Sequence, residues 1–171
     1  MKKFILLSVL SFCLTLTSVK AQDAAEALYK TGEKFVLSGE FDKAIPYFDQ
    51  ALQANPKHKA SLSRRGFCKV QGGDYNGAIA DYTLLIETEP KEKFAYLSRG
   101  SAKNKLEQYD SAIEDFNKVL AIDPKDTEAL NNRGVAKKKK GDKAGACADW
   151  TASKKLGNGD AKLMLDNNKC K

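Results

Sequence analysis

The feature that most constrains this chain is an internal repeat of 34 residues that begins near residue 25. Four columns of chemically similar residues keep this period. They are glycine at 32, 66, 100 and 134, alanine at 44, 78, 112 and 146, an aromatic residue at 48, 82, 116 and 150, and proline at 56, 90 and 124, with Asn158 in the fourth proline position. Such a period is typical of repeat proteins, in which each unit buries its apolar face only against its neighbours.

The columns are explained if each repeat consists of two antiparallel helices. Glycine and alanine let the two backbones approach closely, the aromatic residues fill the space between units, and proline ends the second helix. Segments such as Ser38-Gly39-Glu40 and Gly72-Gly73-Asp74 are expected to form the turn between the two helices. An acceptor or a negative charge suits the free N–H groups of a helix start, and we expect this role for Asp42, Asn76 and Asp110.

With these columns, the chain resembles the tetratricopeptide repeat (TPR) family over about residues 25–158. The resemblance implies an all-α fold, namely a right-handed α-solenoid of four TPR helix–turn–helix repeats. The expected repeats lie at about residues 25–58, 59–92, 93–126 and 127–160 of a TPR domain that spans residues 22–171. A short capping helix is expected at about residues 161–171, with Asp160 at its start, because a solenoid otherwise ends in an open apolar face.

The N-terminus has the three parts of a secretory signal peptide. Lys2 and Lys3 form a basic start, Phe4–Leu16 is an apolar run, and Val19-Lys20-Ala21 offers small residues for cleavage before Gln22. We therefore expect residues 1–21 to be removed and the protein to be exported to a periplasmic or extracellular location. The mature chain is expected to have no integral membrane segment. Lipid attachment at Cys13 stays open as a minor alternative, although the bulky Phe12 before it fits such processing poorly.

The charge of the chain argues against nucleic acid as a partner. The formal net charge is +7, but three of the lysines lie in the predicted signal peptide, and the excess left in the mature chain is mild. The most concentrated positive segment is Lys137–Lys140, at the end of a first helix. There cations suit the helix dipole, and we expect a solvated helix end. A surface for an anionic partner is the alternative.

Two further columns depart from the family pattern. Arginine stands before the glycine in the last three repeats, and aspartate stands in their second helices. The pairs are Arg65 with Asp81, Arg99 with Asp115, and Arg133 with Asp149, whereas the first repeat has Thr31 and Tyr47. Both members of a pair lie about eight residues from the turn, so they are expected at the same level as inter-helix ion pairs, with the next repeat as an open further partner. A lysine column at 69, 103 and 137 is expected to keep its ammonium groups in water.

Two cysteines lie at equal distances from the turn at Gly157–Asp160. In an antiparallel hairpin, Cys147 and Cys170 would face each other at a distance that suits a disulfide. An oxidising compartment would preserve the bond, which would contribute about 3 kcal/mol. Cys68 shares its column with Ala102 and Ala136, which predicts a buried and inert thiol.

No constellation of catalytic or metal-binding residues stands out, so we expect a protein that is not an enzyme and has no cofactor. The single histidine, His58, follows Pro56 and is expected to be a solvated loop residue. The glycine pairs lack the Lys-Ser/Thr that completes a phosphate-binding loop.

The TPR resemblance implies that the first helices line a concave groove that holds a partner. The residues expected there are Tyr29, Glu33, Val36, Leu37, Ser63, Phe67, Val70, Gln71, Phe94, Leu97, Ser101, Asn104, Lys105, Asn131, Val135, Lys138 and Lys139. Packing of several of them between helices is the alternative. The carboxylate clamp of some family members is absent, because Tyr29 and Glu33 occupy its first-repeat positions and Glu33 would repel a carboxylate.

The sequence thus predicts a non-catalytic scaffold or adaptor that binds an unidentified protein or peptide. Two other hypotheses stay open. One is an envelope-associated protein that contacts anionic lipid or glycan through Lys137–Lys140, or a lipoprotein. The other is self-association through the open end of the first repeat.

Overall fold

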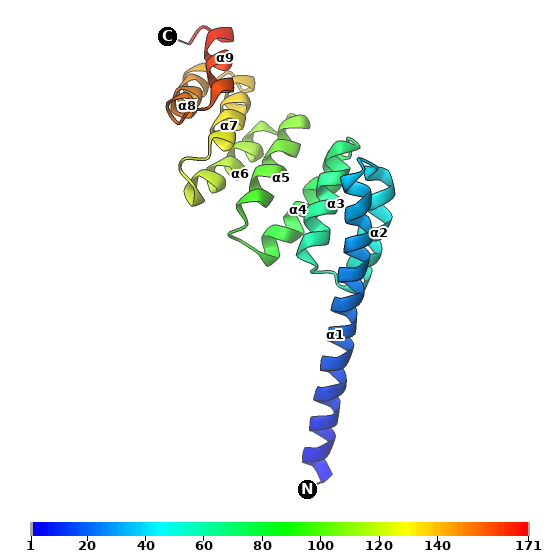
Figure 1. Ribbon diagram of the computed structural model, residues 1–171. Coiled ribbons are helices and arrows are strands. Elements are labelled where there is room, and N and C mark those ends of the chain that lie inside the picture. Colours follow the sequence, from blue (N-terminus) through cyan, green and yellow to red (C-terminus); the bar gives the residue numbers. More distant parts are fainter. Residues whose placement is uncertain (1, 171) are drawn as a thin grey trace. The chain divides into compact units, whose positions relative to one another are not determined.

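The structure is a computed structural model that describes the backbone of residues 2–170 and the side chains of residues 20–170. Within this part of the chain, every regular element is an α-helix (Figure 1). The expectation of an all-α array of helix pairs is confirmed. The chain divides into two compact units, Met1–Gly73 and Asp74–Lys171, and each is described by itself.

The first unit holds α1 (Lys2–Leu37), α2 (Phe41–Ala54) and α3 (Lys59–Gln71). Helix α2 packs against both α1 and α3. The centre of this packing is Phe48, which is fully buried together with Ala44 and Cys68. A Cβ at Gly32 would lie 2.7 Å from Cε1 of Phe48, so only glycine allows α1 to approach this ring so closely.

The second unit continues the pattern through six helices. They are α4 (Tyr75–Thr88), α5 (Lys93–Lys105), α6 (Tyr109–Ile122), α7 (Thr127–Lys139), α8 (Lys143–Lys155) and α9 (Gly159–Asn167). Each packs against the next along the chain. The aromatic residues Phe116 and Trp150 are buried, and a Cβ at Gly100 or Gly134 would lie 2.9 Å or 2.5 Å from their rings. The glycine and aromatic columns therefore form one recurring contact, as the repeat predicts.

The second helices begin two residues earlier than the residues that we expected to cap them. Asp74 and Asp142 are the caps of α4 and α8, and their carboxylates accept from the N–H groups of Gly77 at 2.9 Å and Gly145 at 2.8 Å. In α2 and α6 the cap position is Glu40 or Gln108 and makes no side-chain cap bond. Asp42 and Asp110 lie in the first turn instead, where their charge still suits the helix start.

The C-terminal helix α9 is capped by Asn158 and not by Asp160. Oδ1 of Asn158 accepts from the N–H of Ala161 at 3.2 Å and from Nδ2 of Asn131 at 3.1 Å. Nδ2 of Asn158 donates to Oγ1 of Thr127 at 3.3 Å. The asparagine in the fourth proline position thus starts α9 and also ties it to α7, which proline could not do because it has no side-chain polar group.

Of the predicted signal peptide, residues 1–21, the structure places residues 2–21 in the N-terminal part of α1. Its side chains up to residue 19, Cys13 among them, lie outside the described residues. In the part of the chain that the structure describes, no helix combines the length and the apolarity that a membrane span requires. Cleavage before Gln22 and lipid attachment at Cys13 both stay predictions.

Candidate functional site

The arginine and aspartate columns meet as buried ion pairs in the second unit. Arg99 donates from Nε and Nη2 to the two carboxylate oxygens of Asp115, at 3.0 Å and 2.6 Å. Nζ of Lys103 lies 2.8 Å from the same carboxylate, which is 4% exposed. The remaining guanidinium nitrogen, Nη1, donates to Oγ1 of Thr83 at 3.1 Å. Every side of the Arg99 guanidinium is thus occupied by groups of this chain.

The fourth repeat copies this arrangement. Arg133 makes the same two bonds to Asp149, at 3.0 Å and 2.6 Å, and Lys137 adds a contact of 2.9 Å. Nη1 of Arg133 donates to Oδ1 of Asn117 at 2.6 Å. The lysine column is therefore paired, and our expectation that its ammonium groups lie in water is wrong for Lys103 and Lys137.

Each of these arginines also bonds to the repeat that precedes its own, and not to the repeat that follows. Thr83 and Asn117 lie 16 residues before Arg99 and Arg133, in the second helix of the repeat before. Arg65 follows the same rule, because its Nη1 donates to Oδ1 of Asp49 at 2.6 Å. Its expected partner Asp81 is buried in the second unit. The arginines therefore bind neighbouring helices together, and none presents a free guanidinium to a ligand.

Only half of the basic run Lys137–Lys140 is left for contact with a partner. Lys137 binds Asp149, and Lys140 makes an ion pair with Asp110. Lys138 and Lys139 are exposed. The basic surface for an anionic partner that the sequence suggested is thus reduced to two side chains.

The structure joins Cys147 to Cys170 by a disulfide, with the Cα atoms 5.6 Å apart. The bond ties the tail after α9 back to α8. Cys68 is the free cysteine among the described side chains and is completely buried. Burial raises the pKa of its thiol to about 11, so the reactive thiolate is scarce at neutral pH.

His58 is buried, with an exposed fraction of 5%, and our expectation of a solvated loop residue is wrong. Its Nδ1 lies 2.8 Å from Oγ of Ser61, its Nε2 lies 3.4 Å from Oε2 of Glu26, and its ring packs on Tyr29. These three groups resemble a nucleophile–base series, but Ser61 is completely buried and its hydroxyl is out of reach of a substrate. The cluster instead ties α1 to α3.

Within the described residues, no group of three or more histidine, cysteine, aspartate or glutamate side chains could hold a metal ion.

The predicted groove residues of the first unit are partly used for packing. Tyr29 and Phe67 pack against the core, Phe67 with its ring edge-on to Phe41 at 5.6 Å. The hydroxyl of Tyr29 donates to Oε2 of Glu33 at 2.6 Å, and burial, followed by this bond, raises the pKa of Tyr29. Val70 is half-buried, while Leu37 is 81% exposed.

Glu33 is less repulsive to a carboxylate than the sequence suggested. Nε of Arg64 lies 2.9 Å from Oε2 of Glu33, and Arg64 supplies the opposite charge. Because Arg64 stands 31 residues after Glu33 on another helix, this pairing could not be read from spacing within one helix.

The second unit contains a groove between α5 and α7 with a volume of about 420 Å³. We call it the α5–α7 groove. Its lining residues are Ser101, Asn104, Lys105, Glu107, Tyr109, Asn132, Val135 and Lys139. The expected residues Ser101, Asn104, Lys105, Val135 and Lys139 thus come together, and the sequence reasoning missed Asn132, Glu107 and Tyr109. Asn132 follows Asn131 on α7, so a shift of one residue in the expected face accounts for that omission.

The α5–α7 groove has a chain of amide groups along its floor. Nδ2 of Asn104 donates to the carbonyl oxygen of Asn132 at 3.2 Å, and Nδ2 of Asn132 lies 3.4 Å from Oγ of Ser101. The Oδ1 atom of Asn104 is buried and has no hydrogen-bond partner among the described residues. Lys105 and Lys139 are exposed at the edge. The wall of the groove therefore contains a buried acceptor without a partner, and its edge carries two positive charges.

Four expected groove residues lie elsewhere in the second unit. Asn131 is only 8% exposed, donates to Asn158 and accepts from Nε1 of Trp150 through its carbonyl group, so its placement on the groove surface was wrong. Phe94 is 45% exposed and packs edge-on against Tyr82. Leu97 is half-buried and Lys138 is exposed, but neither lines the groove.

Comparison with known proteins gives the same architecture. A family model described as tetratricopeptide repeat matches residues 35–98, and a second, described as TPR repeat, matches residues 100–141. No curated protein matches the chain.

Three solved structures illustrate the structural likeness. MamA, residues 41 to the end, from Desulfovibrio magneticus RS-1 has a TM-score of 0.76 at 18% identity, over 86% of this chain and 88% of that one. A tetratricopeptide repeat protein from Parabacteroides merdae has a TM-score of 0.75 at 24% identity, over 82% of this chain and 57% of that one. The first TPR of Spaghetti (RPAP3), bound to the HSP90 peptide SRMEEVD, has a TM-score of 0.67 at 23% identity, over 70% and 95%. At these identities the likeness concerns the fold.

Proposed function

Because the chain belongs to the tetratricopeptide repeat family, we propose that it is a non-catalytic scaffold that holds a peptide segment of a partner protein in the α5–α7 groove. The observation that carries the proposal is the buried, unpartnered Oδ1 of Asn104 on the floor of this groove. A buried acceptor without a donor destabilises the free protein. A bound segment would remove this penalty if the Asn104 side chain turned its Oδ1 toward the groove and the segment supplied an N–H group.

The charge at the edge of the groove indicates the kind of segment that binds best. Lys105 and Lys139 flank the amide chain on α5 and α7, and Glu107 is the one acidic lining residue. A peptide with a carboxylate near its anchoring N–H group would gain charge-assisted hydrogen bonds from the two lysines. The peptide SRMEEVD in the RPAP3 structure is acidic, which supports this chemistry by analogy.

We also propose that the protein acts after export. The basic start at Lys2 and Lys3, the apolar run that follows and the disulfide between Cys147 and Cys170 support this location, because such bonds persist in oxidising compartments. The intact mass of the protein from its own cells tests it. A chain that begins at Gln22 supports soluble export, a lipid adduct on Cys13 indicates a lipoprotein, and a full-length chain contradicts the proposal.

Photocrosslinking in cells tests the binding function directly. A photoreactive amino acid replaces Val135 on the groove wall, and a matched chain carries it at Glu114, an exposed residue of α6 outside the groove. We expect protein adducts from position 135 that are absent from position 114. Adding Asn104→Ala and Lys139→Ala is expected to reduce these adducts. Equal labelling at both positions, or labelling that the two substitutions leave unchanged, would contradict the proposal.

A further inference from the structure

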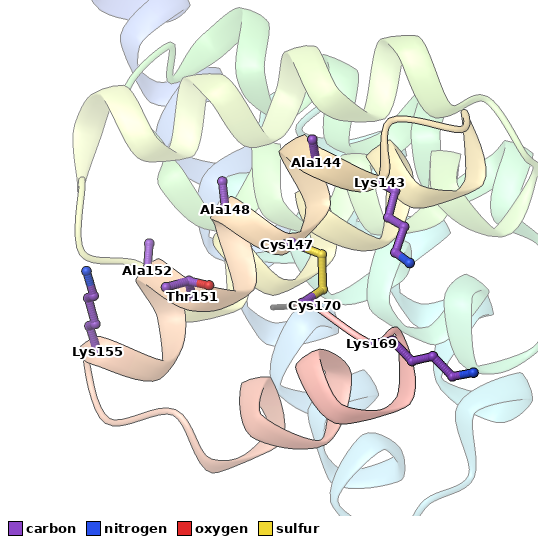
Figure 2. A pocket seen from close by; sticks show the side chains of 9 residues that line it. All are labelled: Lys143, Ala144, Cys147, Ala148, Thr151, Ala152, Lys155, Lys169 and Cys170. Carbon is purple, nitrogen blue, oxygen red and sulfur yellow. A yellow bond between two sulfur atoms is a disulfide. The ribbon is translucent and has the colours of Figure 1, made fainter.

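A second surface with the features of a binding site lies on α8, in the second unit. It is a pocket of about 770 Å³, shown in Figure 2, which we call the α8 pocket. Its lining residues are Lys143, Ala144, Cys147, Ala148, Thr151, Ala152, Lys155, Lys169 and Cys170. None of these residues lines the α5–α7 groove.

The floor of the α8 pocket differs from the corresponding surface one repeat earlier. Ala144, Ala148 and Ala152 follow one another at intervals of four residues and therefore form one stripe along the helix. The residues 34 positions earlier, on α6, are Asp110, Glu114 and Lys118. Three charged side chains of the repeat are thus replaced by methyl groups. Short side chains along a row of this kind let another helix approach closely and pack its own ridge against them.

Positive charge stands at both ends of this alanine stripe. Lys143 and Lys169 lie at one end and Lys155 at the other (Figure 2). All three are exposed, and none has a carboxylate within salt-bridge distance among the described residues. Over the length of the helix, Lys143 and Lys155 are separated by about 18 Å. A helical ligand that neutralises both ends must therefore carry negative charges about 12 residues apart along its own helix.

The preceding repeat shows which contacts the corresponding part of its second helix makes. On α6, Asn117 binds Arg133 of the following helix α7, and Asp110 binds Lys140, the residue directly after the end of α7. The residues of α8 at these two positions are Ala144 and Thr151. The following helix α9 ends at Asn167 after 9 residues, whereas α7 has 13. Among the described residues, none of the helices covers this face beside these two residues of α8, and both residues line the pocket.

The disulfide gives the pocket a defined wall. Because Cys170 is bonded to Cys147, Lys169 is held beside α8 (Figure 2). A residue whose backbone is held in place before binding loses less backbone freedom when the ligand arrives.

We propose that the α8 pocket docks an acidic helix of a partner protein, whose small residues lie on the stripe Ala144, Ala148 and Ala152 and whose carboxylates reach Lys143 and Lys169 at one end and Lys155 at the other. The complementary charge commits the site to an acidic occupant, and the row of short side chains, against which the ridge of a second helix packs, commits it to a helix. The proposal does not depend on the α5–α7 groove.

A phage-displayed library of helical peptides of 20 residues, selected against the oxidised chain from Gln22 onward, tests the proposal. We expect the enriched peptides to carry Asp or Glu at the two ends of one face, with Ala, Gly or Ser between them. The substitution Ala148→Trp fills the floor and is expected to abolish their binding. The matched control Glu114→Trp, at the same repeat position of α6, is expected to leave it unchanged. The exposed substitution Lys155→Glu should weaken binding by about tenfold or more, since like charges then meet.

Three results would overturn the proposal. The first is enrichment of peptides without the acidic, helix-spaced pattern. The second is binding that survives both Ala148→Trp and Lys155→Glu but is lost with Lys139→Ala, which would assign the peptides to the α5–α7 groove. The third is self-association in analytical ultracentrifugation that Ala148→Trp abolishes, which would make a second copy of this chain the occupant.

Discussion

At the scale of single residues, the buried aspartates 115 and 149 are the points at which neighbouring helices are joined. Asp115 receives two bonds from Arg99 and one contact from Lys103, so two cations depend on one carboxylate. Arg99 and Lys103 have side chains that are only 17% and 14% exposed. Removing one member of such a group leaves the others desolvated and unpaired, which destabilises a protein more than the intact group stabilises it.

We predict that Asp115→Asn lowers the free energy of unfolding by about 3 kcal/mol, because Arg99 and Lys103 then lose their anion. The matched control is Asp110→Asn on the same helix. Asp110 pairs with Lys140 but is 80% exposed. Its loss should change the stability by less than about 1 kcal/mol. Urea denaturation of both variants measures the difference, and equal losses would show that burial of the pair is not what matters.

The carboxylate of Asp123 gives a prediction on pH. Nζ of Lys93 lies 2.8 Å from Oδ2 of Asp123, and this bond, followed by the N–H of Lys125, holds the pKa of Asp123 below its usual value. A depressed pKa contributes stability above the pKa of the unfolded carboxyl, and this contribution is lost as the pH falls through the folded value. In Lys93→Met we predict a higher pKa of Asp123 in a titration followed by NMR. A pKa unchanged by Lys93→Met would assign the shift to the Lys125 backbone.

The three cysteines expected in the mature chain should differ sharply in reactivity. Thiol labelling of the unfolded, unreduced chain from Gln22 onward should modify one cysteine, Cys68, because Cys147 and Cys170 are bonded. In the native chain at pH 8, Cys68 should label slowly, since burial raises its pKa to about 11. Mass spectrometry counts the adducts. Three adducts on the unfolded chain would show that the disulfide is absent.

At the scale of helices, the sequence is informative wherever a column repeats. The glycine, alanine and aromatic columns predicted the close helix pairs, and Pro56, Pro90 and Pro124 each lie two residues beyond the end of a second helix. The period also aligned Arg99 with Asp115. It could not show that Nη1 of Arg99 reaches back to Thr83, because the direction of that reach depends on how consecutive repeats are stacked.

The repeat columns did not predict the roles of residues whose chemistry occurs in one repeat alone. His58 has no counterpart that repeats its chemistry, and only the packing of its ring under Glu26 and Tyr29 explains its burial. Asn158 was noted as a substitute for proline, but the sequence also offered Asp160 as a cap two residues later. The choice between two neighbouring caps depends on the exact start of α9, which is the least certain part of any helix prediction.

Mutation can distinguish the two candidate caps of α9, Asn158 and Asp160. We predict that Asn158→Ala destabilises α9 by about 1 kcal/mol, because the bond to the N–H of Ala161 is lost. The same substitution also removes the bonds to Asn131 and Thr127. Asp160→Ala removes only a first-turn charge and should change the stability by less than about 0.5 kcal/mol. Amide hydrogen exchange of residues 159–167 reports the effect, and a larger change in Asp160→Ala would mean that α9 starts later.

At the scale of the whole molecule, the candidate site followed from the family pattern only in part. The first helices α5 and α7 do line a groove, as the TPR resemblance implies, and five of the expected residues lie in it. Tyr29 and Phe67 instead pack, partly buried, against the core, and Asn131 is buried, because a residue near the edge of a helix face can turn toward either side. The α8 pocket was not predicted, although the disulfide that forms part of its wall was, because only the structure shows that Lys169 and Cys170 of the tail lie beside the alanine stripe of α8.

Stability in a repeat array depends on contacts between neighbours, which predicts a local response to reduction of the disulfide. In the second unit each helix packs against the next along the chain, and the disulfide joins the last helix pair. Reduction releases a closed loop that spans 23 residues, whose closure is worth about 3 kcal/mol. We therefore predict faster hydrogen exchange in α8, α9 and the tail after reduction, and unchanged exchange in α1, α2 and α3, because repeat units stabilise only their neighbours. A Cys147→Ser/Cys170→Ser variant should reproduce the pattern without reductant, which controls for any effect of the reductant at Cys68. Faster exchange throughout the chain would instead mean that both units unfold as one cooperative body.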